Sequence, residues 1–198
     1  MSLPSTAREF AMDVTRYTRT AILLHWLIAA GIIVNVTLAW VWPHLADNGV
    51  RPAIDTHKSI GITILGLALL RLLWRLTHRP PPLPTGYARW ETGVSHATHW
   101  SLYLVMFAMP LSGWIMDSAW KDAATHPMYL FGFFEWPRLG FVRHLDAALC
   151  DRLHDGFGAA HIWCSYLLYG LFALHVAGAA KHQILDGEPE LRRMGIGH

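Results

Sequence analysis

The sequence has 198 residues, of which 53% are hydrophobic and only 15% are charged, and its mean hydropathy is +0.27. These values lie on the membrane side of the range for soluble domains, so a soluble globule is the less favoured class. The formal net charge of +2 is small and scattered, which argues against a nucleic-acid partner. Cys150 and Cys164 lie in no C-x-x-C spacing, so thiolate zinc sites, iron–sulfur clusters and covalently attached haem have no support.

Four apolar segments of about twenty residues follow one another along the chain. They predict membrane-spanning helices at 20–42, 54–76, 96–116 and 158–180, with a long connection at 117–157. The polar residues before the first span do not resemble a cleavable signal, so this span is expected to stay as an anchor. The expected fold is one all-α domain over 1–198, an integral membrane four-helix bundle.

The distribution of Lys and Arg predicts the orientation of these spans. Nine Lys and Arg residues lie in the N-terminal segment, the connection between the second and third spans, and the C-terminal segment. Six lie on the other side of the membrane. Four of those six lie in the connection 117–157 beside six acidic residues, so the short connections weigh more. Since positive charge favours the cytoplasmic side, both termini are expected in the cytoplasm.

Four histidines lie inside the predicted spans at two depths. His25 and His175 are each about five residues from the cytoplasmic end of their spans, and His57 and His161 are near the outer ends. The fourteen residues from His161 to His175 correspond to about 21 Å along a helix and about 40° around its axis, so both project from nearly one face. The sequence predicts two stacked sites, each closed by a histidine from another helix.

A histidine at bilayer depth is costly, and it suggests a bound partner. Zinc commonly takes three or four protein ligands, but the spans carry no Asp or Glu at these two levels. Haem iron takes its equatorial ligands from the porphyrin, so two axial imidazoles complete its coordination. Two histidine pairs therefore predict two b-type haems. For any single one of these residues, a hydrogen-bonded interior histidine is the alternative.

Several stretches, in this order and spacing, resemble the prokaryotic cytochrome b561 family of four-helix di-haem membrane proteins. They are RYTRTAILLHWL, THKSIGI, LLRLLWRL before a proline-rich turn, HATHWSLYLVMFAMPLSGW, FGFFEWPRL, and H-x13-H followed by KHQILDGEPELRRM. The resemblance covers essentially the whole chain and implies a multi-pass protein of the bacterial inner membrane. It implies that His25 and His175 ligate a cytoplasmic-side haem b, and that His57 and His161 ligate a periplasmic-side haem b.

The resemblance adds three residues to the expected site. Arg71 is expected near a haem propionate, with an arginine snorkelling to the interface as the alternative. His182 is expected beside a quinone site, with an ordinary interfacial histidine as the alternative. His99 has no depth-matched partner. It is expected to contact a haem-ligating residue, to bond a haem propionate or to lie near the quinone. His154 is the alternative ligand for a fourth span that begins earlier.

Two histidine ligands leave no open iron position, so the predicted function is transfer of single electrons without direct oxygen binding. The resemblance implies membrane lipid as a partner, a quinone with ubiquinone as the expected substrate, and a periplasmic or membrane redox partner. It leaves two variants open: a stand-alone protein that oxidises superoxide and reduces ubiquinone, or a haem-bearing anchor of a dehydrogenase or hydrogenase. Four spans with little beyond them favour the first. Lys58 beside His57 fits attraction of superoxide, whereas the acids of 117–157 oppose it. A histidine-based metal-handling membrane protein is the more remote alternative.

Overall fold

The computed structural model describes residues 16–82 and 86–197. Four long helices make up most of this chain: α1 Arg19–Val41, α2 Asp47–Thr77, α3 Arg89–Ser118 and α5 Ala147–Ile184. The short elements are the 3-10 helix η2 Trp42–His44, strands β1 Tyr129–Leu130 and β2 Phe134–Glu135, and helices α4 Gly140–Arg143 and α6 Glu190–Arg193. The fold is mostly helical, as predicted, and it adds one small antiparallel hairpin that the sequence patterns did not indicate.

Several helices extend beyond the apolar stretches that predicted them. α1 agrees with its predicted span to one residue, whereas α5 begins at Ala147 and not near 158. Asp146 starts α5, because its carboxylate accepts a hydrogen bond of 2.9 Å from the N–H of Leu149. The connection predicted at 117–157 therefore includes the first turns of α5.

Three of the long helices are long and apolar enough to cross a membrane: α1 together with η2, α2 and α5. Their outward faces carry exposed apolar side chains, such as Leu23, Ile33, Leu69, Trp163 and Leu167. α3 has 30 residues, but its first half is rich in charged, hydroxyl and imidazole side chains. The membrane location of α3 as a fourth span therefore stays a prediction.

The helices pack as α1 on α2 and α3 on α5, and α2 on α3 joins the two pairs. A central core is contributed by α1, α2 and α3: Ile28, Ile64, Ala68, Tyr103 and Met106. α5 adds only Leu168 to the buried residues. At Gly31, α1 approaches α2 so closely that an added Cβ would lie 3.2 Å from Cγ1 of Ile64. α5 thus packs beside this core and leaves its histidines facing α1 and α2.

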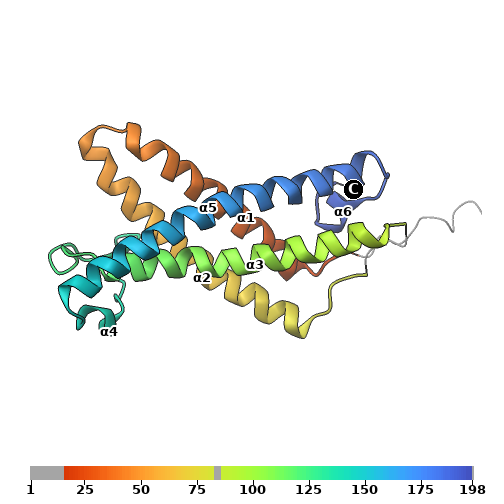
Figure 1. The fold of residues 1–198 in the computed structure, drawn as a ribbon. Coiled ribbons are helices and arrows are strands. Elements are labelled where there is room, and N and C mark those ends of the chain that lie inside the picture. The colour runs from red at the N-terminus through yellow and green to blue at the C-terminus, as the bar shows by residue number, and fades with distance from the viewer. Residues whose placement is uncertain (1–15, 83–85, 198) are drawn as a thin grey trace, which may run out of the picture.

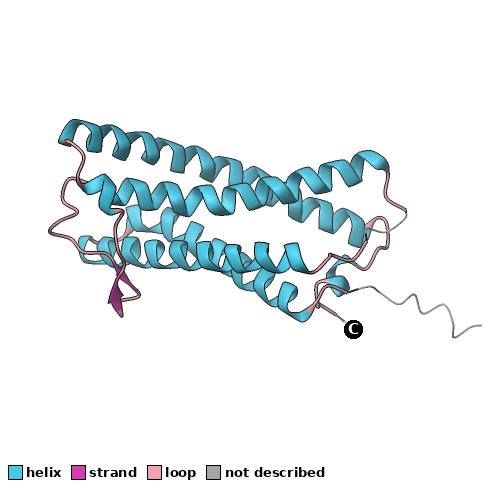
Figure 2. Ribbon diagram, turned by 90° about the horizontal axis from the view of Figure 1, so that it is seen from below, coloured by secondary structure: helices cyan, strands magenta, loops and turns pink. Residues whose placement is uncertain are grey.

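The start of α1 and the segment around α6 meet at one end of the bundle. The N–H of Tyr17 donates to the carbonyl of Arg193 (3.2 Å), and Nε1 of Trp26 donates to the carbonyl of Met194 (2.9 Å). The hairpin and α4 lie at the opposite end (Figures 1 and 2). We call these the terminal end and the hairpin end.

Candidate functional site

The four span histidines come together as two cross-helix pairs. His25 of α1 and His175 of α5 have ring centroids 6.1 Å apart, and we call them the terminal-end pair. His57 of α2 and His161 of α5 have ring centroids 6.1 Å apart, and we call them the hairpin-end pair. These are the two pairs that the depth argument predicted. All four side chains are half-buried.

The hairpin-end imidazoles are oriented by backbone carbonyls. Nδ1 of His57 lies 3.1 Å from the carbonyl oxygen of Asn35, and Nδ1 of His161 lies 3.0 Å from that of Met109. A carbonyl oxygen only accepts, so in each neutral ring Nδ1 carries the proton and Nε2 keeps its lone pair. Metal-ligating histidines are commonly fixed in this way.

Gly113 of α3 gives His161 the room it needs. An added Cβ at Gly113 would lie 3.3 Å from Cε1 and 3.5 Å from Nδ1 of His161. The hydroxyl of Ser112 is also 3.0 Å from Nδ1 of His161. α3 therefore fixes the position of the imidazole ring that α5 contributes.

The terminal-end pair has a different surrounding. Nη1 of Arg71 lies 2.8 Å from Nδ1 of His25, and Nε of Arg71 donates to the hydroxyl of Tyr103 at 3.2 Å. A guanidinium only donates, so Nδ1 of His25 is the acceptor in this contact. Arg71 is half-buried and bonded inside the bundle, which is not the arrangement of a snorkelling arginine.

His99 lies at the same level as the terminal-end pair. Its ring centroid is 5.4 Å from that of His175. Tyr103, which holds Arg71, is one turn further along α3. No sequence motif indicated Tyr103, although its i+4 spacing from His99 places both residues on one face of the helix.

His182 lies near the end of α5 in a polar cluster. Its Nδ1 is 2.6 Å from Oδ2 of Asp186, and its ring stacks on Tyr87 at 3.9 Å between centroids. The hydrogen bond from Lys181 holds the pKa of Asp186 below its usual range, with a second contribution from His182. Burial, and then the hydrogen bond to Glu190, raises the pKa of Tyr87.

A buried ion cluster ties the hairpin end together. Nζ of Lys58 lies 2.6 Å from Oδ1 of Asp117, and Nε of Arg138 lies 2.8 Å from Oδ2. Arg138 also donates to the carbonyls of Ala123 and His126. Lys58 is therefore ion-paired with Asp117, which it shares with Arg138, and is not the free cation that its place beside His57 suggested. Asp117 was expected among the acids of the connection, and only the folded chain joins it to Lys58.

His154 and the remaining polar groups do not extend the pairs. Nδ1 of His154 lies 2.9 Å from the carbonyl of Met116, although α5 does begin early enough to include it. Across residues 16–82 and 86–197, no three His, Cys, Asp or Glu side chains gather as a metal-ion site.

The spacing of each pair fits one iron between two imidazoles. A metal–imidazole bond is about 2 Å long, and a ring centre lies about 1 Å behind its nitrogen, so centres about 6 Å apart are expected. Two donors per site match the axial requirement of haem and fall short of the three or four protein ligands typical of zinc.

Apolar helices with paired interior histidines define the class of helical membrane cytochromes. The chain belongs to the prokaryotic cytochrome b561 family, whose model matches residues 16–197. It is accordingly a multi-pass protein of the bacterial inner membrane that binds haem b and transfers electrons.

Two curated relatives are similar over nearly their whole lengths. "Cytochrome b561 homolog 2" of Escherichia coli (strain K12) is 32% identical over 192 residues, which cover 94% of this chain and 94% of the relative. "Probable superoxide oxidase CybB" of Yersinia pestis is 28% identical over 184 residues, covering 90% and 95%.

Proposed function

We propose that the chain binds two haem b groups and passes electrons from a periplasmic-side donor to ubiquinone. One haem would be held by His25 and His175, and the other by His57 and His161. The observation that carries this proposal is the equal 6.1 Å spacing of the two pairs. When bound, haem b would supply one-electron redox chemistry, and the two histidines of each pair would leave its iron no position for oxygen.

We propose superoxide as the donor. Two superoxide ions, one ubiquinone and two protons then give two dioxygen molecules and one ubiquinol. At the hairpin end, Lys58 and Arg138 share the single carboxylate of Asp117, so these three side chains together carry one net positive charge, and Lys58 directly follows His57 in the chain. This excess charge favours approach of an anion. The relative from Yersinia pestis is named a probable superoxide oxidase, which supports the same activity.

The terminal end supplies the quinone side of the proposal. His182 and Asp186 form an imidazole–carboxylate pair that can hold a proton and release it to a reduced quinone. Tyr87 stacks on His182 and fixes the plane of its ring. In this arrangement α3 is the fourth span, and the terminal end faces the cytoplasm, where its arginines satisfy the positive-inside rule.

The experiment is a haem count followed by a turnover assay on the purified protein. A pyridine haemochrome count should give two haem b per chain, and a superoxide-generating system should drive ubiquinol formation. The His154→Ala variant is the matched control and should keep both haems, because His154 belongs to neither pair. Binding of two haems without superoxide-dependent formation of ubiquinol would contradict superoxide as the electron donor. That result would favour the role of a haem-bearing anchor subunit. Absence of haem would contradict the whole proposal and bring forward the metal-handling alternative.

A further inference from the structure

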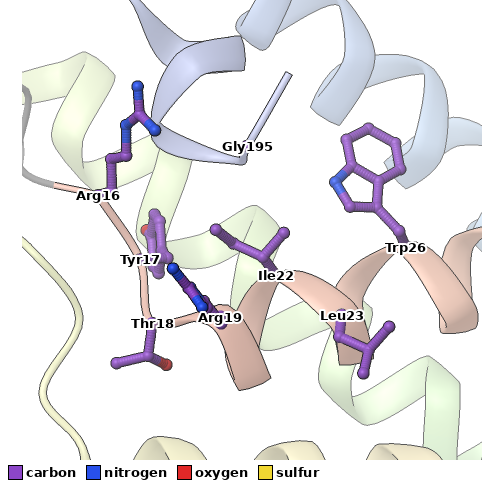
Figure 3. A pocket seen from close by; sticks show the side chains of 8 residues that line it. All are labelled: Arg16, Tyr17, Thr18, Arg19, Ile22, Leu23, Trp26 and Gly195. Atoms are coloured by element: carbon purple, nitrogen blue, oxygen red, sulfur yellow. The ribbon is translucent and has the colours of Figure 1, made fainter. Parts of the chain in front are cut away.

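A pocket of about 680 Å³ lies at the terminal end, between the start of α1 and the chain segment after α6. In Figure 3, Arg16 and Tyr17 lie on one side of it and Trp26 on the other, with Ile22 and Gly195 between them. None of these five residues takes part in the electron transfer proposed above, so the pocket needs its own explanation.

The pocket carries positive charge that the described chain does not neutralise. Arg16 and Arg19 line it, both are exposed, and within residues 16–82 and 86–197 neither has a hydrogen-bond or ion-pair partner. None of the lining residues is acidic. By contrast, Arg71 and Arg138 are both bonded inside the bundle. Two uncompensated guanidinium groups favour an anionic ligand and are well suited to phosphate.

The rest of the pocket is apolar and continues along the outer face of the first span. Leu23 is 59% exposed and Trp26 is 39% exposed, and both lie on α1 beyond the arginines. Tryptophan is enriched at the level of the lipid headgroups, where an apolar ring can sit beside a polar N–H. A cationic mouth followed by an apolar strip matches the order of groups in a phospholipid.

The C-terminal segment builds the opposite wall. Nε1 of Trp26 donates to the carbonyl of Met194 at 2.9 Å. Gly195 has a φ of +80°, and an added Cβ would lie 3.2 Å from Cγ2 of Ile22. Only glycine suits both this conformation and this close approach. The pocket therefore depends on contact between the first turns of α1 and the segment after α6.

We propose that this pocket binds an anionic phospholipid from the leaflet at the terminal end. Its phosphate would lie at Arg16 and Arg19, and an acyl chain would follow Leu23 and Trp26. A neutral quinone would leave both arginines uncompensated, so the charges favour the lipid. Juxtamembrane Lys and Arg each contribute about 1 kcal/mol to binding of anionic lipid surfaces, which converts to about 30-fold in affinity for two.

The test is native mass spectrometry of the haem-loaded protein in detergent with added phosphatidylglycerol or with phosphatidylcholine of the same acyl chains. The Arg16→Gln/Arg19→Gln double variant should bind phosphatidylglycerol roughly 10- to 30-fold more weakly, with phosphatidylcholine binding unchanged. The matched control is Arg143→Gln/Arg152→Gln, which removes two exposed charges at the hairpin end and should keep the wild-type affinity. An unchanged haem spectrum would show that each variant is folded.

Three outcomes would overturn the proposal. Equal loss of phosphatidylglycerol in both double variants would show that only net charge matters. Competition by inorganic phosphate or glycerol phosphate at the affinity of the lipid would show a phosphate site with no lipid contribution. Displacement of the bound lipid by ubiquinone, with the same dependence on Arg16 and Arg19, would assign the pocket to quinone.

Discussion

The two histidine pairs share one ring spacing, yet their imidazoles are held by different kinds of group. At the hairpin end, His57 and His161 face the backbone carbonyls of Asn35 and Met109. At the terminal end, His25 faces the guanidinium of Arg71, and the ring of His99 lies beside His175. A carbonyl within a helix cannot move away from its neighbours, whereas an arginine side chain can.

The group that contacts Nδ1 decides whether Nε2 of the same imidazole ring is free to bind iron. The carbonyls place the proton of His57 and His161 on Nδ1, which frees Nε2 in the ligand-ready tautomer. Arg71 instead donates to Nδ1 of His25, so a neutral His25 carries its proton on Nε2. Ligation through Nε2 at the terminal end therefore requires Arg71 to release His25. We expect the hairpin-end site to be rigid and the terminal-end site to be adjustable.

The largest expected effect is the loss of one haem from either end. His161→Ala should remove the hairpin-end haem and His175→Ala the terminal-end haem, because each leaves one axial ligand. The haemochrome count should fall from two to one per chain in each variant. Electron paramagnetic resonance of the oxidised proteins should then show a different low-spin signal remaining in each. One shared remaining signal would contradict the assignment of separate sites.

Disruption of the buried ion cluster at the hairpin end should be the next largest effect. Asp117→Asn leaves Lys58 and Arg138 without their shared carboxylate, and breaking a buried pair costs about 3–5 kcal/mol. Asp55→Asn, which breaks the more exposed pair with Arg51, is the control and should cost at most about 1 kcal/mol. Thermal unfolding measures both changes. Equal shifts would mean that burial of the cluster contributes nothing.

Gly113→Ala should disturb the hairpin end alone. The added methyl group meets Cε1 of His161 at 3.3 Å, and overpacking of this kind costs about 1–3 kcal/mol. Gly170→Ala on α5 is the control, because an added Cβ there meets nothing within 4 Å. We expect weaker haem retention at the hairpin end for the first variant, followed by absorbance during haem extraction. Retention equal to that of the control would remove Gly113 from the site.

Arg71→Met should affect the terminal end alone. Removing a positive charge near the terminal-end haem stabilises the oxidised state of that haem. Its midpoint potential should therefore fall by tens of millivolts, which is the order expected for a partly screened Coulomb interaction. A redox titration monitored in the visible region measures both haems in one sample. The hairpin-end potential should stay fixed. A shift in both potentials, or in neither, would show that Arg71 does not distinguish the two ends.

The smallest expected effect is a pH dependence at the terminal end. Lys181, and then His182, lower the pKa of Asp186, so its ionised form stabilises the fold above the ordinary Asp pKa of about 4. This stability is lost as the pH falls through the folded-state value. The difference in melting temperature between the wild-type and Asp186→Asn proteins should therefore be largest near pH 7 and become smaller as the pH falls below about 4. A difference that stays constant as the pH falls below about 4 would point to a cause other than the charge of Asp186.

The sequence by itself determined the main helices and the pairing of the histidines. Apolar stretches of bilayer length located them, and the fixed rise of a helix placed His161 and His175 at two levels. The sequence also predicted that His25 and His57 lie at those levels, because depth in a membrane can be counted along a span. The limits of α5 were not predicted, since helices continue into polar segments that hydropathy does not follow.

Only the tertiary structure decided what each imidazole contacts at Nδ1. Two of these contacts join different helices: His57 meets the carbonyl of Asn35, and His25 meets the guanidinium of Arg71. The ion pair of Lys58 with Asp117 also joins two helices. Such contacts depend on how helices rotate and approach one another, which is set by packing at positions such as Gly31 and Gly113. Periodicity and depth carry no information about rotation between neighbouring helices. For that reason the histidine pairs could be predicted from the sequence, and the difference between their two environments could not.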